Sequence, residues 1–123
     1  MTGWEGAAGS RIATVRLTNH GQTACLIADL ARPQLVDASG ILIDGTAPAT
    51  AGQLVVEPGA GLETLVSAGN YCGLSPVAPV SVAFILGDGD RLVADPVSPT
   101  DATVPPCLGT SQPAAISMHT WAP

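Results

Sequence analysis

The sequence predicts an all-β protein, an antiparallel immunoglobulin-like β-sandwich of about seven to nine strands. Fourteen Gly and eleven Pro divide the chain into short apolar segments. Within these segments apolar and polar side chains alternate, which is the period of a strand with one buried face, and none of them has helical periodicity. Turn signals recur about every 8–12 residues, as in all-β sandwiches. We therefore expect residues 1–123 to form a single domain.

Each expected strand is an alternating segment bounded by turn residues. In the first, Val15 and Leu17 should face the core while Arg16 faces solvent. The same alternation places Val56, Val82 and Phe84 in the core and Ser81 on an outer face. The expected strands, in order, are residues 11–19, 25–28, 34–37, 41–44, 53–57, 62–67, 80–86, 91–94 and 114–121.

Turn residues predict three hairpins. The first turns at Ala38-Ser39-Gly40, the second at Pro58-Gly59-Ala60-Gly61 and the third at Gly87-Asp88-Gly89-Asp90, which is the clearest signal. Residues 45–52, rich in Thr, Ala and Pro, are expected to form a loop. Residues 95–113 hold five of the eleven prolines, so we expect them to run extended across one end.

Composition excludes several classes of protein. Apolar residues make up 46% of the chain and charged residues 11%, which argues against disorder. There is no Lys, and four Arg against ten carboxylates give a net charge of −6. This charge opposes binding to nucleic acid or to an anionic membrane surface. No segment is long and apolar enough to be expected to cross a membrane.

The three cysteines predict one disulfide. No Cys-x-x-Cys is present, which argues against a zinc ribbon or a thioredoxin-like protein. Cys72 and Cys107 lie in Gly- or Pro-flanked segments that we expect at the same end of the sandwich, so we predict that they pair. Cys25 lies in an apolar strand, where we predict a buried thiol. The alternative is that Cys25 pairs with one of the other two across the sheets, as in antibody domains.

A disulfide implies an oxidising compartment, so we expect an extracytoplasmic protein, secreted or lipid-anchored. In that case the targeting segment has been removed from this chain, because no signal peptide is visible.

No group of residues predicts a metal site or a catalytic site. The Gly87–Asp90 turn lacks the six to eight oxygen ligands that calcium needs, so solvated carboxylates are expected. Met118 and His119 would suit copper, but adjacent strand residues point to opposite faces. Glu57 and Glu63 flank a predicted hairpin as glycosidase carboxylates could, although a solvated edge is favoured. We expect no catalytic residue, cofactor or metal.

Aromatic residues are scarce. Trp4, Tyr71 and Trp121 are the candidates for a ligand face that stacks on sugars, although packing in the core or at an edge is favoured for each. A carbohydrate-binding module requires Trp121 to share an exposed face with Trp4 or Tyr71.

Several short motifs, in order along almost the whole chain, resemble those of domain-of-unknown-function family 4232. This family is common in exported proteins and lipoproteins of high-GC Gram-positive bacteria. The motifs are Gly6-Ala7-Ala8-Gly9, Leu17-Thr18-Asn19-His20-Gly21, Ala24-Cys25-Leu26, Pro33-Gln34-Leu35, Asp37-Ala38-Ser39-Gly40, Val56-Glu57-Pro58-Gly59, Asn70-Tyr71-Cys72-Gly73, Pro79-Val80-Ser81-Val82 and Pro105-Pro106-Cys107. Family members usually carry a further Cys ahead of the first strand and a Trp near the position of Ala68 or Tyr71, and this chain has neither.

The resemblance implies an extracytoplasmic β-sandwich and transfers no catalytic residue. We expect a non-enzymatic module with a binding or structural role at the cell envelope, where its partner is a protein or a glycan. A carbohydrate-binding module is the alternative, followed by a small hydrolase. A deep pocket lined by Asp or Glu beside His20 or His119 would favour the hydrolase.

Overall fold

Strands make up all of the regular secondary structure in the described part of the chain. The structure is a computed structural model that describes residues 1–7, 9–28, 31–46, 53–86 and 89–123. These residues contain ten strands and no helix, every strand pair is antiparallel, and no sheet closes into a barrel. The predicted all-β class is therefore confirmed.

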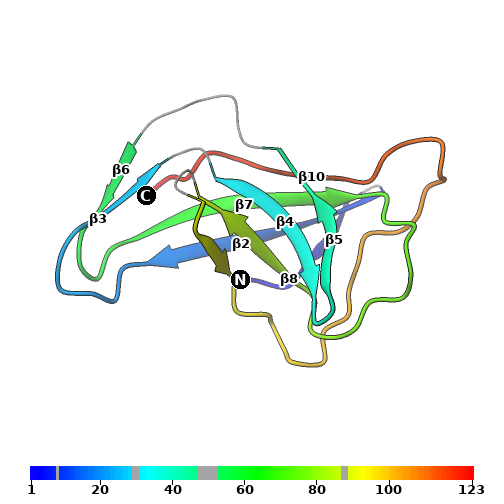
Figure 1. The fold of residues 1–123 in the computed structure, drawn as a ribbon, viewed down its shortest axis with the longest axis horizontal. Coiled ribbons are helices and arrows are strands. Elements are labelled where there is room, and N and C mark those ends of the chain that lie inside the picture. The colour runs from blue at the N-terminus through cyan, green and yellow to red at the C-terminus, as the bar shows by residue number, and fades with distance from the viewer. Residues whose placement is uncertain (8, 29–30, 47–52, 87–88) are drawn as a thin grey trace.

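The strands form two four-stranded sheets and a two-stranded ribbon (Figure 1). The first sheet has the order β1 (Glu5–Ala7), β2 (Ser10–Thr18), β7 (Gly61–Gly69), β10 (Ala115–Met118). The second sheet has the order β5 (Gly40–Asp44), β4 (Arg32–Asp37), β8 (Ser81–Ile85), β9 (Arg91–Val93). The ribbon pairs β3 (Cys25–Ala28) with β6 (Gln53–Val56).

One hydrophobic core is shared by both sheets, which lie one behind the other in Figure 1. Val15 and Val66 from the first sheet meet Leu35 and Val82 from the second, and all four are buried. The ring of Trp121 lies against Phe84 with their centroids 5.1 Å apart and their planes tilted by 55°. Aliphatic burial therefore holds the two sheets together, as expected for a chain with few aromatics.

Facing along β2 is as predicted. Val15 is buried, Leu17 is half-buried against the core, and Arg16 is exposed. Val56, Val82 and Phe84 are buried as well, as predicted.

The prediction that Ser81 faces solvent is wrong, because this residue is only 3% exposed. It belongs to β8, a central strand in which four consecutive residues are buried, so both faces of the strand are covered. The Ser81 hydroxyl donates to the carbonyl oxygen of Ala94. The buried hydroxyl thus keeps a hydrogen bond, which offsets its removal from water.

Two of the three predicted hairpins are present. β4 pairs with β5, and β8 pairs with β9. The central residues of the third turn, 87–88, lie outside the described residues, as do residues 47–52 of the predicted loop. The short strand β1 is present although no alternating pattern predicts it.

The hairpin predicted around Pro58-Gly59 is wrong, because β6 pairs with β3 and β7 pairs with β2. The buried side chain of Asn19 donates from Nδ2 to the carbonyl oxygens of Thr23 and Val56, at 2.8 and 2.9 Å. Its backbone exchanges further hydrogen bonds with Gly59 and Ala60. Asn19 thus joins the two turns at the point where the chain crosses from the ribbon to the first sheet, a tertiary contact that local turn residues do not reveal.

A disulfide joins Cys72 to Cys107, the pair predicted from the sequence. Beside it the Asn70 side chain donates to the carbonyl oxygens of Gly109 and Gln112, and its Oδ1 accepts from the backbone N–H of Leu108. The long segment after β9 is therefore fastened to the end of β7 by one covalent bond and three hydrogen bonds.

Cys25 is exposed, so the prediction that its thiol is buried is wrong. It begins β3 of the ribbon, which has only two strands, and no third strand among the described residues covers it. Val56, the register partner of Cys25 on the same face of the ribbon, is buried in the core.

Gly45, directly after β5, lies against the backbone of β10 from the other sheet. A Cβ atom at this position would lie 2.6 Å from the carbonyl oxygen of Ile116 in β10 and 2.7 Å from that of Pro33 in β4. Only a residue without a side chain fits between these two backbones.

Candidate functional site

The candidate site is an apolar groove that opens between the edges of the two sheets, where β2 and β9 face each other. Its volume is about 230 Å³. Val15, Phe84 and Trp121 are buried residues that line it, and Arg16 and Asp95 bring a charge of each sign. The remaining lining residues are Met1, Leu17, Leu92, Val93 and Ala94.

The edge of β2 at this groove has unpaired backbone groups. Glu63 exchanges backbone hydrogen bonds with Ala122, so the backbone groups of Glu63 point away from β2. Arg16 lies opposite Glu63 in the register, and its own N–H and C=O therefore point to the other side of β2. Among the described residues no backbone group there pairs with Arg16.

The edge of β9 is open in the same way. The N–H of Ala94 donates to the carbonyl oxygen of Val82 in β8, so the neighbouring Val93 points its N–H and C=O away from β8. Both rims of the groove therefore offer backbone donors and acceptors of the kind that an additional strand would use.

Met1 and Thr2 lie at one end of the groove. Thr2 donates its N–H to the carbonyl oxygen of Thr14 at 2.9 Å, and its hydroxyl accepts from the N–H of Thr14 at 2.9 Å. The amino group of Met1 donates to the carbonyl oxygen of Asp95 at 3.2 Å. This short segment thus contacts the edges of both sheets.

The side chain of Arg16 forms an ion pair with Glu63, with Nη1 and Oε1 3.2 Å apart, on the outer face of the first sheet. Both side chains are about half exposed, so the pair contributes little to stability. Its structural effect is to direct the guanidinium group toward the neighbouring strand.

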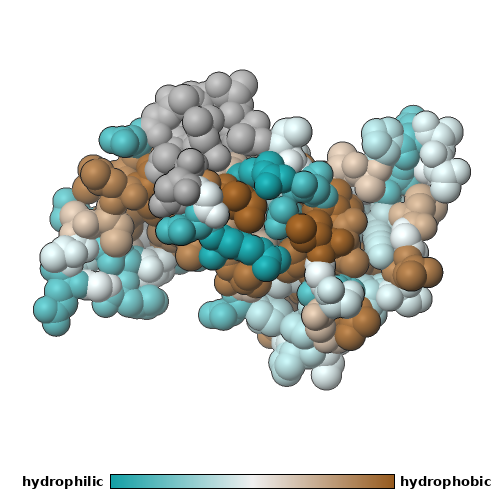
Figure 2. Space-filling model, in the orientation of Figure 1, coloured by the Kyte–Doolittle hydropathy of each residue, from teal (hydrophilic) through white to brown (hydrophobic). Residues whose placement is uncertain are grey.

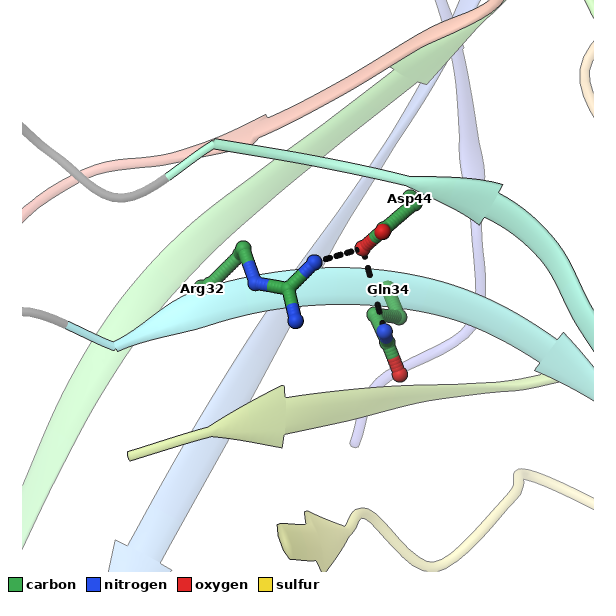
Figure 3. A network of polar contacts seen from close by, with 3 residues as sticks. All are labelled: Arg32, Gln34 and Asp44. Carbon is green, nitrogen blue, oxygen red and sulfur yellow. Dashed lines mark hydrogen bonds and ion pairs between the residues drawn. The ribbon is translucent and has the colours of Figure 1, made fainter. Parts of the chain in front are cut away.

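A second polar cluster lies on the outer face of the second sheet (Figure 3). The Asp44 carboxylate of β5 accepts hydrogen bonds from two side chains of β4, the guanidinium group of Arg32 and the amide of Gln34. The hydrogen bond from Gln34 is the largest cause that holds the pKa of Asp44 below its usual value. Desolvation, the next largest, acts in the opposite direction, and the hydrogen bond and charge of Arg32 lower the pKa further. Gln34 itself is 3% exposed, and its Oε1 has no hydrogen-bond partner in the described part of the chain.

The surroundings of this cluster are mixed. Figure 2 shows hydrophilic residues across the middle of the face that carries β4 and β5, with hydrophobic residues on both sides. Gln34 Oε1, the atom of this cluster that is buried without a partner in the described part of the chain, does not meet a ligand at the surface. The cluster joins β4 to β5 through side-chain hydrogen bonds.

The three aromatic residues named as a ligand face do not share an exposed surface. Trp121 is 4% exposed, Tyr71 is buried and donates its hydroxyl to the carbonyl oxygen of Leu74, and Trp4 packs half-buried against the core. The indole N–H groups of Trp4 and Trp121 are buried with no acceptor among the described residues. The stacking platform that a carbohydrate-binding module requires is therefore not formed by these rings.

The other residues singled out in the sequence are also separate from one another. Glu57 follows the ribbon while Glu63 pairs with Arg16, so the two carboxylates do not face each other across a hairpin. His119 is exposed and Met118 packs against the core, on opposite faces as predicted. No cluster of three His, Cys, Asp or Glu suitable for a metal ion occurs within the described ranges. The prediction that the Gly87–Asp90 turn binds no calcium depends partly on residues 87–88, which lie outside the described residues.

Sequence reasoning missed both the groove and the Arg32–Gln34–Asp44 cluster. The cluster had a signal: Arg32 and Gln34 share one strand face, and the hairpin register places Asp44 opposite Gln34. The groove had none, because its lining comes from five separate stretches of the sequence, residues 1, 15–17, 84, 92–95 and 121.

Comparison with known proteins found no matching family model, no similar curated protein and no similar solved structure. Among the described residues there is also no helix of the length and apolar character that would span a membrane.

Proposed function

We propose that this chain is a non-enzymatic binding module with an immunoglobulin-like β-sandwich fold that works outside the cytoplasm, at the cell envelope. The observation that carries the proposal is the apolar groove of about 230 Å³ with an open strand edge on each rim. Apolar concave sites with a few polar groups at the rim are typical of binding sites. The immunoglobulin-like class is supported by two antiparallel four-stranded sheets that share one core.

The extracytoplasmic location is supported by the Cys72–Cys107 disulfide, since disulfides persist in oxidising compartments and are rare in the cytosol. The resemblance of the sequence motifs to domain-of-unknown-function family 4232 supports the same location and a role in an exported protein or lipoprotein. The partner is a protein rather than a glycan, because Trp121 and Tyr71 are buried.

Thiol labelling in cells tests the location. The natural gene, with its upstream sequence, is expressed in its own host with a C-terminal tag, and the protein is alkylated before and after reduction in each cell fraction. We expect the protein in an extracytoplasmic fraction, with Cys25 alkylated directly and Cys72 and Cys107 alkylated only after reduction. A cytoplasmic protein with three directly reactive thiols would contradict the proposal.

A further inference from the structure

We infer that the groove between β2 and β9 binds an extended segment of a partner protein, which adds to the edge of β2 as a further strand. The inference rests on the proposed binding function and names its partner. Strand addition uses main-chain hydrogen bonds for affinity and alternate side chains for specificity. Both requirements are met at this place.

The main-chain requirement is met by β2 between Val15 and Thr18. β1 ends its pairing at the Glu5–Ile12 register position, and Thr2 bonds to Thr14 farther along. Beyond that point the N–H and C=O of Arg16 are unpaired among the described residues, and Thr18 has the same orientation two residues on. About four residues of edge, roughly 14 Å, are therefore free to accept a strand that continues the line of β1.

The side-chain requirement is met by the groove itself. Successive side chains of an added strand would point alternately to the outer face of the first sheet and into the groove. The inward ones would meet Val15 of the first sheet on one side, Phe84 and Leu92 of the second sheet on the other, and the ring of Trp121. This lining selects an apolar residue at every second position of the partner segment.

The contacts of Met1 and Thr2 show that main-chain groups can bond at both rims of this groove. Thr2 already bonds to the same edge of β2, and Met1 contacts the groove lining and donates to Asp95. A partner strand would repeat this mode of contact one step farther along β2.

Charge indicates a foreign partner rather than a second copy of this chain. The net charge of −6 would be repelled by an identical chain and attracted by a basic one. We therefore assign the groove to a segment that alternates apolar and polar residues and carries Lys or Arg at its ends.

A peptide probe tests the inference by amide hydrogen exchange in NMR. The probe is the acetylated and amidated peptide Lys-Val-Thr-Val-Thr-Val-Lys, and the control peptide has Pro in place of both Thr, which removes strand donors while keeping charge and apolar residues. At a concentration that fills about nine-tenths of the sites, exchange of the Arg16 and Thr18 amides should slow about tenfold, because exchange then occurs from the free protein. The control peptide should leave both rates unchanged.

A matched pair of variants locates the contact. Leu92→Glu places a carboxylate in the groove at a residue that is already 41% exposed, so the fold should tolerate it, and affinity for the probe should fall about tenfold because the carboxylate loses water on binding. Leu74→Glu makes the same change at an 88% exposed residue outside the groove and should leave affinity unchanged.

Three outcomes would overturn the inference. The first is that the probe leaves amide exchange at Arg16 unchanged. The second is protection of the Val93 amide alone, which would place the added strand on β9. The third is protection that rises with protein concentration in the absence of peptide, which would assign the edge to a second copy of this chain. None of these outcomes changes the result expected from the thiol-labelling experiment, and an intracellular location would not change the result expected from the peptide experiment. Failure of one proposal can therefore be distinguished from failure of the other.

Discussion

Removal of the disulfide should destabilise this fold severely. The bond closes a loop with a sequence separation of 35 residues between Cys72 and Cys107. For a loop of this length the chain-entropy relation gives about 4 kcal/mol of stabilisation, because the oxidised chain has fewer unfolded conformations. That is a large share of the roughly 5–15 kcal/mol by which small domains are stable. The closed segment contains β8 and β9 together with long stretches outside the strands.

Urea unfolding of the oxidised protein and of the Cys72→Ser/Cys107→Ser double variant measures this difference. With an m-value of about 2 kcal/mol/M, the midpoint should fall by about 2 M. Cys25→Ser is the matched control: it removes an exposed, unpaired thiol and should change stability by less than about 0.5 kcal/mol. A loss below about 1 kcal/mol in the double variant, or an equal loss in the control, would refute the reasoning.

Two further predictions concern the close approach of the sheets and the polar cluster. Gly45→Ala should destabilise the fold by about 1–3 kcal/mol in thermal unfolding, because its Cβ would lie 2.6 and 2.7 Å from two carbonyl oxygens, whereas Gly3→Ala, with no atom within 4 Å, should be neutral. An unchanged melting temperature for Gly45→Ala would contradict the contact. Because the folded pKa of Asp44 lies below its ordinary 3.8, this carboxylate stabilises the fold above about pH 4 and ceases to do so as the pH falls through the folded pKa. Gln34→Leu should raise the NMR titration midpoint of Asp44, since the Gln34 hydrogen bond is the largest cause of the shift, and an unmoved midpoint would exclude that cause.

Turn residues in the sequence predicted the hairpins that join strands adjacent in sequence. The turns at Ala38-Ser39-Gly40 and between β8 and β9 specify hairpins whose strands are neighbours in sequence, and both are present. The partner of β6 could not be predicted from Pro58-Gly59, because the contacts that accompany the actual pairing, such as those of the buried Asn19, are tertiary.

Burial of single residues was harder to predict than strand facing. Alternation gives the face of a strand but not what covers that face, so Ser81 in a central strand and Cys25 in a two-stranded ribbon were both misplaced. The groove depends on the relative position of the two sheets, which the pattern of a single strand does not contain.

The pairing of β2 with β7 and of β7 with β10 sets an order for folding. Arg16 and Glu63 lie 47 residues apart, and the last contact to Glu63 comes from Ala122 at the end of the chain. Hairpins close within microseconds, whereas pairings of this sequence separation are slow because loop closure must come first. The hairpins of the second sheet can therefore form first, and the first sheet follows once β2, β7 and β10 have met. Before β10 pairs with β7, Ile116 and Trp121 are missing from the core and this edge of β7 is bare.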